Sequence, residues 1–260
     1  MNSLLAERLY LKHQPAAILF SDEKPSRASE FVPGRWGCAA AMLTAATRGA
    51  EAAFSLASCT CHGARNGLCL SAERSAGMDY FMTCGHARTE GQVMPGREPQ
   101  GYKKDEATAR ATRLKLPLKA IGQKYVVFRP LAGVRPEDAP RVVVMYANPD
   151  QLAALVSMAN FAHPGYDNVM APSGSACMTF CLLAEHENAM ERPRAVISMT
   201  DVFARKFIEP DLLAFAMPWR LFREMEASVP GSFLERRAWR SLACRVKDAC
   251  RVKDASRTGR

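Results

Sequence analysis

The residues of this 260-residue chain that could carry chemistry are mainly thiols. Two of them open candidate helices behind loops of small residues: Cys38 follows residues 33–37, and Cys177 follows residues 172–175. Orphan amides and the positive end of the helix dipole at a helix start favour the thiolate form of cysteine. Both thiols are therefore candidate nucleophiles or ligands. Packing of a helix against a sheet is the structural alternative, since free cysteine is among the most buried residue types.

The densest group of ligand-type residues runs from Cys59 through Cys61 to Cys69. Thiolates bind Zn²⁺ and iron–sulfur clusters. No Cys-x2-Cys pair is present, and none of the spacings fits a zinc finger or a ferredoxin. A metal or cluster would have to be held by distant segments, and Cys38, Cys61 and Cys177 are the candidate ligands. Further residues of these types are Cys84, His86 and Cys181.

The same segment offers a turn that could bind an anion. Because Gly63 and Gly67 carry no side chain, an anion could approach the backbone amides of this turn closely. Arg65 adds a positive charge in the turn, and Arg35 adds another in the loop before Cys38. The glycines match neither a Walker loop nor a dinucleotide fingerprint.

Three hypotheses about function follow from these residues. The first is binding of a metal, an iron–sulfur cluster or an anionic small molecule at a cysteine-containing site. The second is an enzyme with Cys38 or Cys177 as nucleophile and an arginine, Arg35 or Arg65, orienting an anionic substrate. The third is a structural or partner-binding protein whose cysteines fill core space, which predicts that the three sulfur atoms lie far apart.

Local patterns predict the elements that must position these residues. We expect strands at 16–20, 52–56, 125–128, 142–146, 195–199 and 212–216, and helices at 38–47, 103–116, 149–158, 173–187, 201–207 and 218–229. Asn148 followed by Pro149 is typical of a capped helix start. Strands alternating with helices indicate a single α/β or α+β domain over residues 1–240, with a mixed sheet flanked by helices.

The net charge of +9 is concentrated near the C-terminus. Residues 235–260 carry nine basic and three acidic side chains, which leaves a net charge of only +3 for residues 1–234. A six-residue unit is duplicated there, as Ala-Cys-Arg-Val-Lys-Asp-Ala occurs at both 243–249 and 249–255. We expect 241–260 to be a basic, disordered tail and expect no specific nucleic-acid partner, because the body offers no basic stripe.

The sequence predicts a cytoplasmic protein without a membrane partner and leaves the oligomeric state open. No apolar run approaches the ~18 residues of a membrane span, and Glu7 and Arg8 interrupt the opening apolar stretch. Hydrophobic residues make up 48% of the chain and charged residues 23%, as in ordinary globular proteins. Nine cysteines, an odd number, favour reduced thiols over disulfides.

Several of these segments together resemble a prokaryotic protein family, domain of unknown function 169, also called ArCR-like. They are Gly37-Cys38, Cys61 to Leu68, Lys124 to Leu131, Ala147 to Leu152, Ala176-Cys177 and Gly231 to Arg236. The resemblance covers most of residues 30–242 and implies no reaction. It does place Cys38, Cys61 and Cys177 on the family's pattern. The thiols that look peculiar to this chain are Cys59, Cys69, Cys181, Cys244 and Cys250.

The chain departs from the family in the second motif, which resembles Cys-Pro-Gly-Gly-Gly-x-Gly-Leu-Gly-Phe. Four residues, Cys61, Gly63, Gly67 and Leu68, are kept. Residues other than the family's proline or glycine stand at His62, Ala64, Arg65 and Cys69. Because a Cβ atom disfavours positive φ and close backbone approach, we expect a ligand contacted by this loop to be lost or altered.

Overall fold

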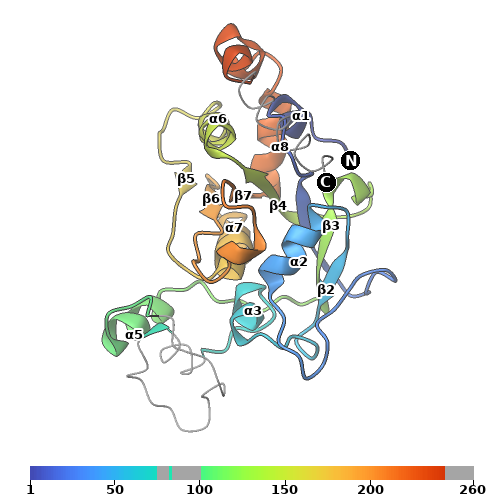
Figure 1. Ribbon diagram of the computed structural model, residues 1–260, viewed down its shortest axis with the longest axis vertical. Coiled ribbons are helices and arrows are strands. Elements are labelled where there is room, and N and C mark those ends of the chain that lie inside the picture. The colour runs from blue at the N-terminus through green and yellow to red at the C-terminus, as the bar shows by residue number, and fades with distance from the viewer. Residues whose placement is uncertain (75–81, 84–100, 244–260) are drawn as a thin grey trace, which may run out of the picture.

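The computed structural model describes residues 1–74, 82–83 and 101–243, and its centre is a seven-stranded sheet with the order β2-β3-β1-β4-β7-β6-β5 (Figure 1). The strands are β1 Ala16–Ser21, β2 Ala52–Phe54, β3 Tyr125–Pro130, β4 Pro140–Ala147, β5 Val169–Met170, β6 Ala195–Ser198 and β7 Leu213–Pro218. Neighbouring strands pair antiparallel except β5 and β6, which are parallel. The mixed sheet predicted from the sequence is therefore confirmed.

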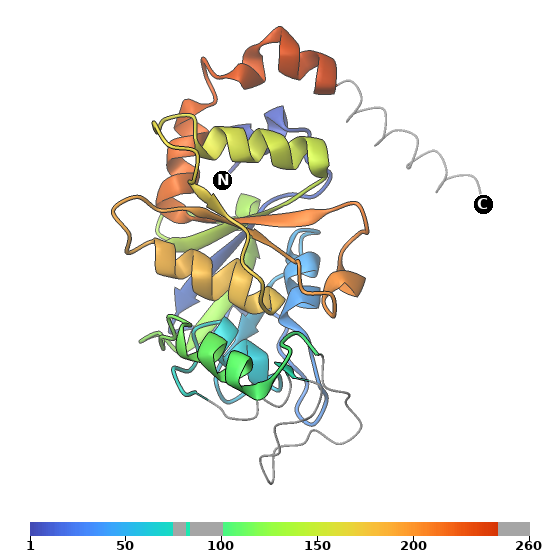
Figure 2. The same cartoon turned by 90° about the vertical axis from the view of Figure 1, so that its left-hand side faces the viewer.

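Helices cover both faces of this sheet, which makes an α+β arrangement of three layers (Figure 2). One face carries α1 Leu4–Arg8, α6 Pro149–Ala159 and α8 Trp219–Ser228. The other carries α2 Ala39–Ala46, α3 His62–Gly67 and a continuous helix over residues 176–187, which consists of a first turn, the π-helical η2 Met178–Leu182 and α7 Leu183–Glu187. Helix α5 Glu106–Leu114 lies beyond α3, at the end of the molecule away from α6 (Figure 1). Short 3-10 turns complete the fold: η1 Leu131–Gly133, η3 Arg205–Phe207 and η4 Phe233–Glu235.

Strand β4 shows why the central strands are continuously apolar. Val142, Val144 and Tyr146 lie in the core beneath α2 and α3, and Val143 and Met145 lie in the opposite core. Successive side chains of a strand point to opposite faces, so a strand covered on both sides must be apolar at every position.

Helix α6 begins as its sequence predicts. The Asn148 side chain accepts a hydrogen bond from the Gln151 amide, the Gln151 side chain accepts one from the Asn148 amide, and Pro149 stands at the first helical position. This reciprocal capping satisfies two of the orphan amides at the helix start.

The helix predicted at 201–207 is wrong, because only η3 Arg205–Phe207 forms there. The Asp201 carboxylate accepts the Phe203 amide within the turn and also the Ala176 amide at the start of another helix. The side chain is therefore used for a tertiary contact as well as a local one, and the segment stays in a turn.

The C-terminal end of the described chain is helical over residues 237–243, and Ala243 is buried in the core with α8. Residues 244–260 lie outside the described residues, so the disordered tail stays a prediction. None of the described helices is long and apolar enough to cross a membrane.

A charged cluster joins the α1–β1 connection, the end of α2 and the segment before β7. Glu209 Oε1 accepts hydrogen bonds from His13 Nε2 at 2.9 Å and Arg48 at 3.0 Å, and Lys12 Nζ lies 3.6 Å away. Burial by itself would raise the pKa of the Glu209 carboxyl, but its own backbone amide, His13 and Arg48 lower this pKa to about 2. The ionised carboxylate thus ties three separate segments together.

We expect Glu209→Gln to lower the free energy of unfolding at neutral pH by about 1–3 kcal/mol, because it removes a charge that several cations face. A carboxyl with a depressed folded-state pKa stabilises the fold above its unfolded pKa of about 4.3, and this contribution is lost as the pH falls toward its folded value of about 2. Urea unfolding of both proteins at several pH values measures the difference. It should shrink steadily below about pH 4.3, and a constant difference would contradict the assignment.

Candidate functional site

The three family-pattern thiols stand at helix starts on one face of the sheet (Figure 1). Cys38 is the N-cap of α2, one residue before the helical turn in which the sequence places it, and Cys61 is the N-cap of α3. Cys177 lies in the first turn of the helix over residues 176–187. Cys61 and Cys177 both lie near Gly63: Cys177 Sγ donates to the Gly63 carbonyl oxygen at 3.6 Å, and Cys61 Sγ is 4.0 Å from the position that a Cβ atom on Gly63 would take. The third hypothesis, in which the cysteines fill core space, stays a prediction.

Burial dominates the protonation of these thiols. Burial, followed by the charge of Cys61, raises the pKa of Cys177 well above the usual value. Burial also raises the pKa of Cys38, although the amides of Ala40 and Ala41 donate to its sulfur and lower it. The helix-start effect predicted from the sequence is therefore present at Cys38 but is outweighed. The pKa of Cys59 is raised by burial to about 11.

The metal hypothesis lacks a donor set. Within residues 1–74, 82–83 and 101–243, no group of three or more His, Cys, Asp or Glu side chains is placed to hold a metal ion. Cys38, Cys61 and Cys177 therefore do not form the three-ligand or four-ligand site that zinc or an iron–sulfur cluster needs. Other cysteine and histidine residues noted in the sequence lie outside the described residues: Cys84, His86, Cys244 and Cys250.

One of the two arginines predicted to orient a substrate has a local side-chain partner. Arg65 Nε donates to the carbonyl oxygen of Cys59 at 3.3 Å, which closes the α3 segment on itself. Arg35 is exposed in the loop before α2, where its backbone amide donates to Val32 O at 3.0 Å. Arg65 therefore has a local structural role, and the proposed role of Arg35 stays a prediction.

Asp201 makes tertiary contacts in this region that the sequence does not indicate. Its Oδ2 accepts the Ala176 amide at 3.1 Å, and its Oδ1 accepts the Tyr102 hydroxyl at 2.7 Å. The carboxylate therefore caps a helix that begins 25 residues earlier in the chain, and its charge raises the pKa of both Cys38 and Cys177. Such a cap has no local sequence signal.

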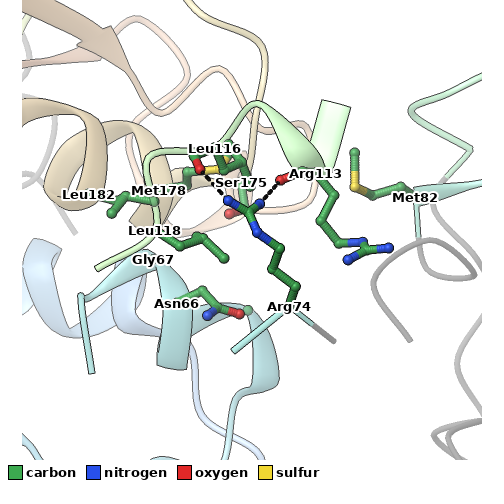
Figure 3. A pocket seen from close by; sticks show the side chains of 11 residues that line it. Asn66, Gly67, Arg74, Met82, Arg113, Leu116, Leu118, Ser175, Met178 and Leu182 are labelled. Atoms are coloured by element: carbon green, nitrogen blue, oxygen red, sulfur yellow. Dashed lines mark hydrogen bonds between the residues drawn. The ribbon is translucent and has the colours of Figure 1, made fainter. Parts of the chain in front are cut away.

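A hollow lies between α3, α5 and residues 175–182 (Figure 3). It holds about 400 Å³ of empty space, part of which is open to solvent. Its apolar lining consists of Met82, Leu116, Leu118, Met178 and Leu182, and its polar lining of Asn66, Arg74, Arg113 and Ser175. Gly63 and Gly67 complete the wall, so both glycines singled out in the sequence face this hollow.

Gly67 allows α3 to lie directly against the helix over residues 176–187. A Cβ atom at Gly67 would lie 2.5 Å from Cys177 Sγ and 2.9 Å from the backbone nitrogen of Met178. At Gly63 the nearest atom to such a Cβ is Cys61 Sγ, at 4.0 Å. Close packing therefore requires glycine at residue 67 but leaves room for a methyl group at residue 63.

Of the three residues that replace a glycine of the family's motif, only Cys69 has a backbone conformation that disfavours a side chain. Ala64 and Arg65 lie inside α3, where a Cβ atom is ordinary. Cys69 takes a φ of 59°, in the left-handed region that favours glycine. The predicted effect of these substitutions on backbone conformation is thus confined to Cys69, at the exit of α3.

The fold and the site define an α+β protein of three layers with a buried thiol cluster and an adjacent small hollow. A family model described as uncharacterised ArCR, domain of unknown function 169, matches residues 4–228. The chain therefore belongs to this family. Neither the search of curated proteins nor the search of solved structures found a match.

We expect Gly67→Ala to destabilise the fold by about 1–3 kcal/mol, because the added methyl group meets backbone atoms that cannot move without shifting a helix. Gly63→Ala is the matched control in the same helix, and we expect it to be neutral or to stabilise by up to about 1 kcal/mol. Thermal and urea unfolding of both variants measure this. Equal effects of the two substitutions would show that α3 does not pack as described.

Alkylation of Cys38 tests whether burial outweighs the helix-start effect. Iodoacetamide reacts with the thiolate, and the pKa of Cys38 is raised above its ordinary value. We expect the rate of modification of the peptide that contains Cys38 to keep rising beyond about pH 9, whereas glutathione as the control begins to level off near its own pKa of about 8.5. A plateau near neutral pH, measured by mass spectrometry, would instead support an activated nucleophile.

Proposed function

We propose that this protein binds a small molecule with an apolar body and an anionic group in the hollow between α3, α5 and residues 175–182. The observation that carries the proposal is the composition of the lining: its charged side chains are both arginines, among walls that are mainly apolar. Such a lining combines apolar contact with a few convergent polar groups, as small-molecule sites do.

The apolar walls would supply most of the affinity. Leu116, Leu118 and Leu182 line the hollow together with two methionines, Met82 and Met178. Removing apolar ligand surface from water contributes about 25 cal/mol per Å². The empty space of about 400 Å³ includes open solvent, so a ligand would lie in a partly open hollow and keep part of its own surface in water.

The two arginines in the lining favour a ligand with a negative charge. Arg74 reaches across the hollow and donates to the carbonyl oxygens of Arg113 and Leu116, which holds its guanidinium in place (Figure 3). Arg113 contributes a second guanidinium from α5. Among the described residues that line the hollow, the charged side chains are positive, and a carboxylate or phosphate on the ligand would pair with them.

The alternatives from the sequence receive less support. The cysteine-dependent enzyme needs a thiolate, and burial raises the pKa of both Cys38 and Cys177. The zinc and iron–sulfur forms of the binding hypothesis need three or four donors, which the described part of the chain does not gather. Of the three ligands in the first hypothesis, an anionic small molecule is the one that the two arginines of the hollow support.

Octanoate is a suitable probe, because it has an apolar chain of modest volume and one carboxylate. We expect it to raise the melting temperature of the protein and to give saturable heat in isothermal titration. Octanol, the matched neutral probe, should bind more weakly, and acetate, which lacks the apolar body, should not bind measurably. Failure of octanoate and octyl phosphate alike to bind saturably would contradict the proposal.

Two variants locate the binding in the hollow. We expect Arg113→Gln to weaken octanoate binding by about tenfold, because a hydrogen bond to a charged group contributes roughly 1.5 kcal/mol or more. Binding of octanol should not change. Arg110→Gln removes the same charge from an exposed position on the same helix and is the control. Leu118→Trp should fill the hollow and abolish binding of both probes, and retained binding would place the ligand elsewhere.

A further inference from the structure

The side chain of Asn66, in the last turn of α3, has its orientation fixed by two backbone contacts. Its amide nitrogen donates to the carbonyl oxygens of Ser71 and Glu73, both at 2.9 Å. An asparagine amide has two N–H donors and one oxygen acceptor, so these two bonds use both donors. The reverse orientation would place the amide oxygen against two carbonyl oxygens. The side chain therefore has a defined nitrogen end and a defined oxygen end.

The oxygen end of this amide is available to a ligand in the hollow. Asn66 is half-buried and lines the hollow, and Figure 3 shows its amide oxygen on the side of the Arg74 side chain. Arg74 directs its guanidinium to the carbonyl oxygens of Arg113 and Leu116 instead. Within the part of the chain that the structure describes, no donor bonds to the Asn66 amide oxygen.

The polar groups of the hollow make two different demands on a ligand. The guanidinium groups of Arg74 and Arg113 carry donors, which suit an anionic group. The Ser175 hydroxyl can donate or accept. The amide oxygen of Asn66 can only accept, so an anionic group placed against it would be repelled. A ligand that satisfies the whole lining therefore needs a hydrogen-bond donor at a second point.

We propose that the ligand of the hollow is a hydroxy acid with an apolar body, and that Asn66 selects it by accepting a hydrogen bond from its hydroxyl group. This inference rests on the proposed function and narrows its ligand class. A ligand without the hydroxyl covers the amide oxygen with apolar surface and removes its water without a replacement. A site that hydrogen-bonds a ligand hydroxyl discriminates against analogues that lack the donor.

Isothermal titration of the full chain with matched pairs of ligands tests the inference. 2-Hydroxyoctanoate and 8-hydroxyoctanoate carry the hydroxyl at opposite ends of the apolar chain. Each is compared with its methyl ether, which keeps the ether oxygen but lacks the donor. We expect at least one hydroxy acid to bind about tenfold more tightly than its own ether, the effect of a single hydrogen bond. Octanoate is measured alongside, because its binding reports on the proposed function alone.

A variant assigns the preference to Asn66. In Asn66→Ala the affinity of the preferred hydroxy acid relative to its ether should fall from about tenfold to about one. The ratio is the readout because loss of the bonds to Ser71 and Glu73 would weaken the hydroxy acid and the ether alike. Ser175→Ala removes another polar group from the same lining and is the matched control, which should keep the ratio.

The outcomes separate this inference from the function on which it rests. Binding of octanoate without a preference for either hydroxy acid over its ether would overturn the role of Asn66 and leave the proposed function standing. Absence of binding by all the probes would overturn both. Loss of the preference in Ser175→Ala but not in Asn66→Ala would assign the acceptor to Ser175 instead. The comparison on the wild-type chain decides the question where Asn66→Ala fails to fold.

Discussion

The contact between α3 and the helix over residues 176–187 positions the thiol of Cys177 and one wall of the hollow. It depends on Gly67, where a Cβ atom would lie 2.5 Å from Cys177 Sγ and would also strike the backbone at Met178. Because the two helices touch without an intervening side chain, the sulfur of Cys177 is held beside Gly63 and Gly67, and both glycines also line the hollow. A shift of this contact would move Cys177 and change the hollow together.

Burial and helix-start electrostatics act in opposite directions on the thiols, and burial is the larger effect. The amides at the start of α2 stabilise a negative charge on Cys38, yet its pKa is raised. The six described cysteines all lie in or against the core on one face of the sheet. An apolar environment disfavours the thiolate, so these cysteines are suited to packing in the core.

Local sequence patterns predicted the elements well where the determinants are local. The apolar runs of β3 and β4 and the capping box of α6 are examples, since each depends on residues adjacent in the chain. The two-residue β5 was missed because it is too short to show alternation. The helix expected at 201–207 failed because Asp201 bonds to Ala176, a partner that no window of sequence contains.

The sequence by itself determined the mixed sheet flanked by helices, the family, and the choice of Cys38, Cys61 and Cys177 among nine thiols. Only the tertiary structure decided which residues meet. It placed Cys61 and Cys177 near Gly63, assigned Asp201 to a remote helix and assembled the hollow from α3, α5 and the π-helical segment. The physical reason is that helix and strand periodicity are set by neighbours along the chain, whereas a close approach such as that at Gly67 depends on atoms from segments far apart.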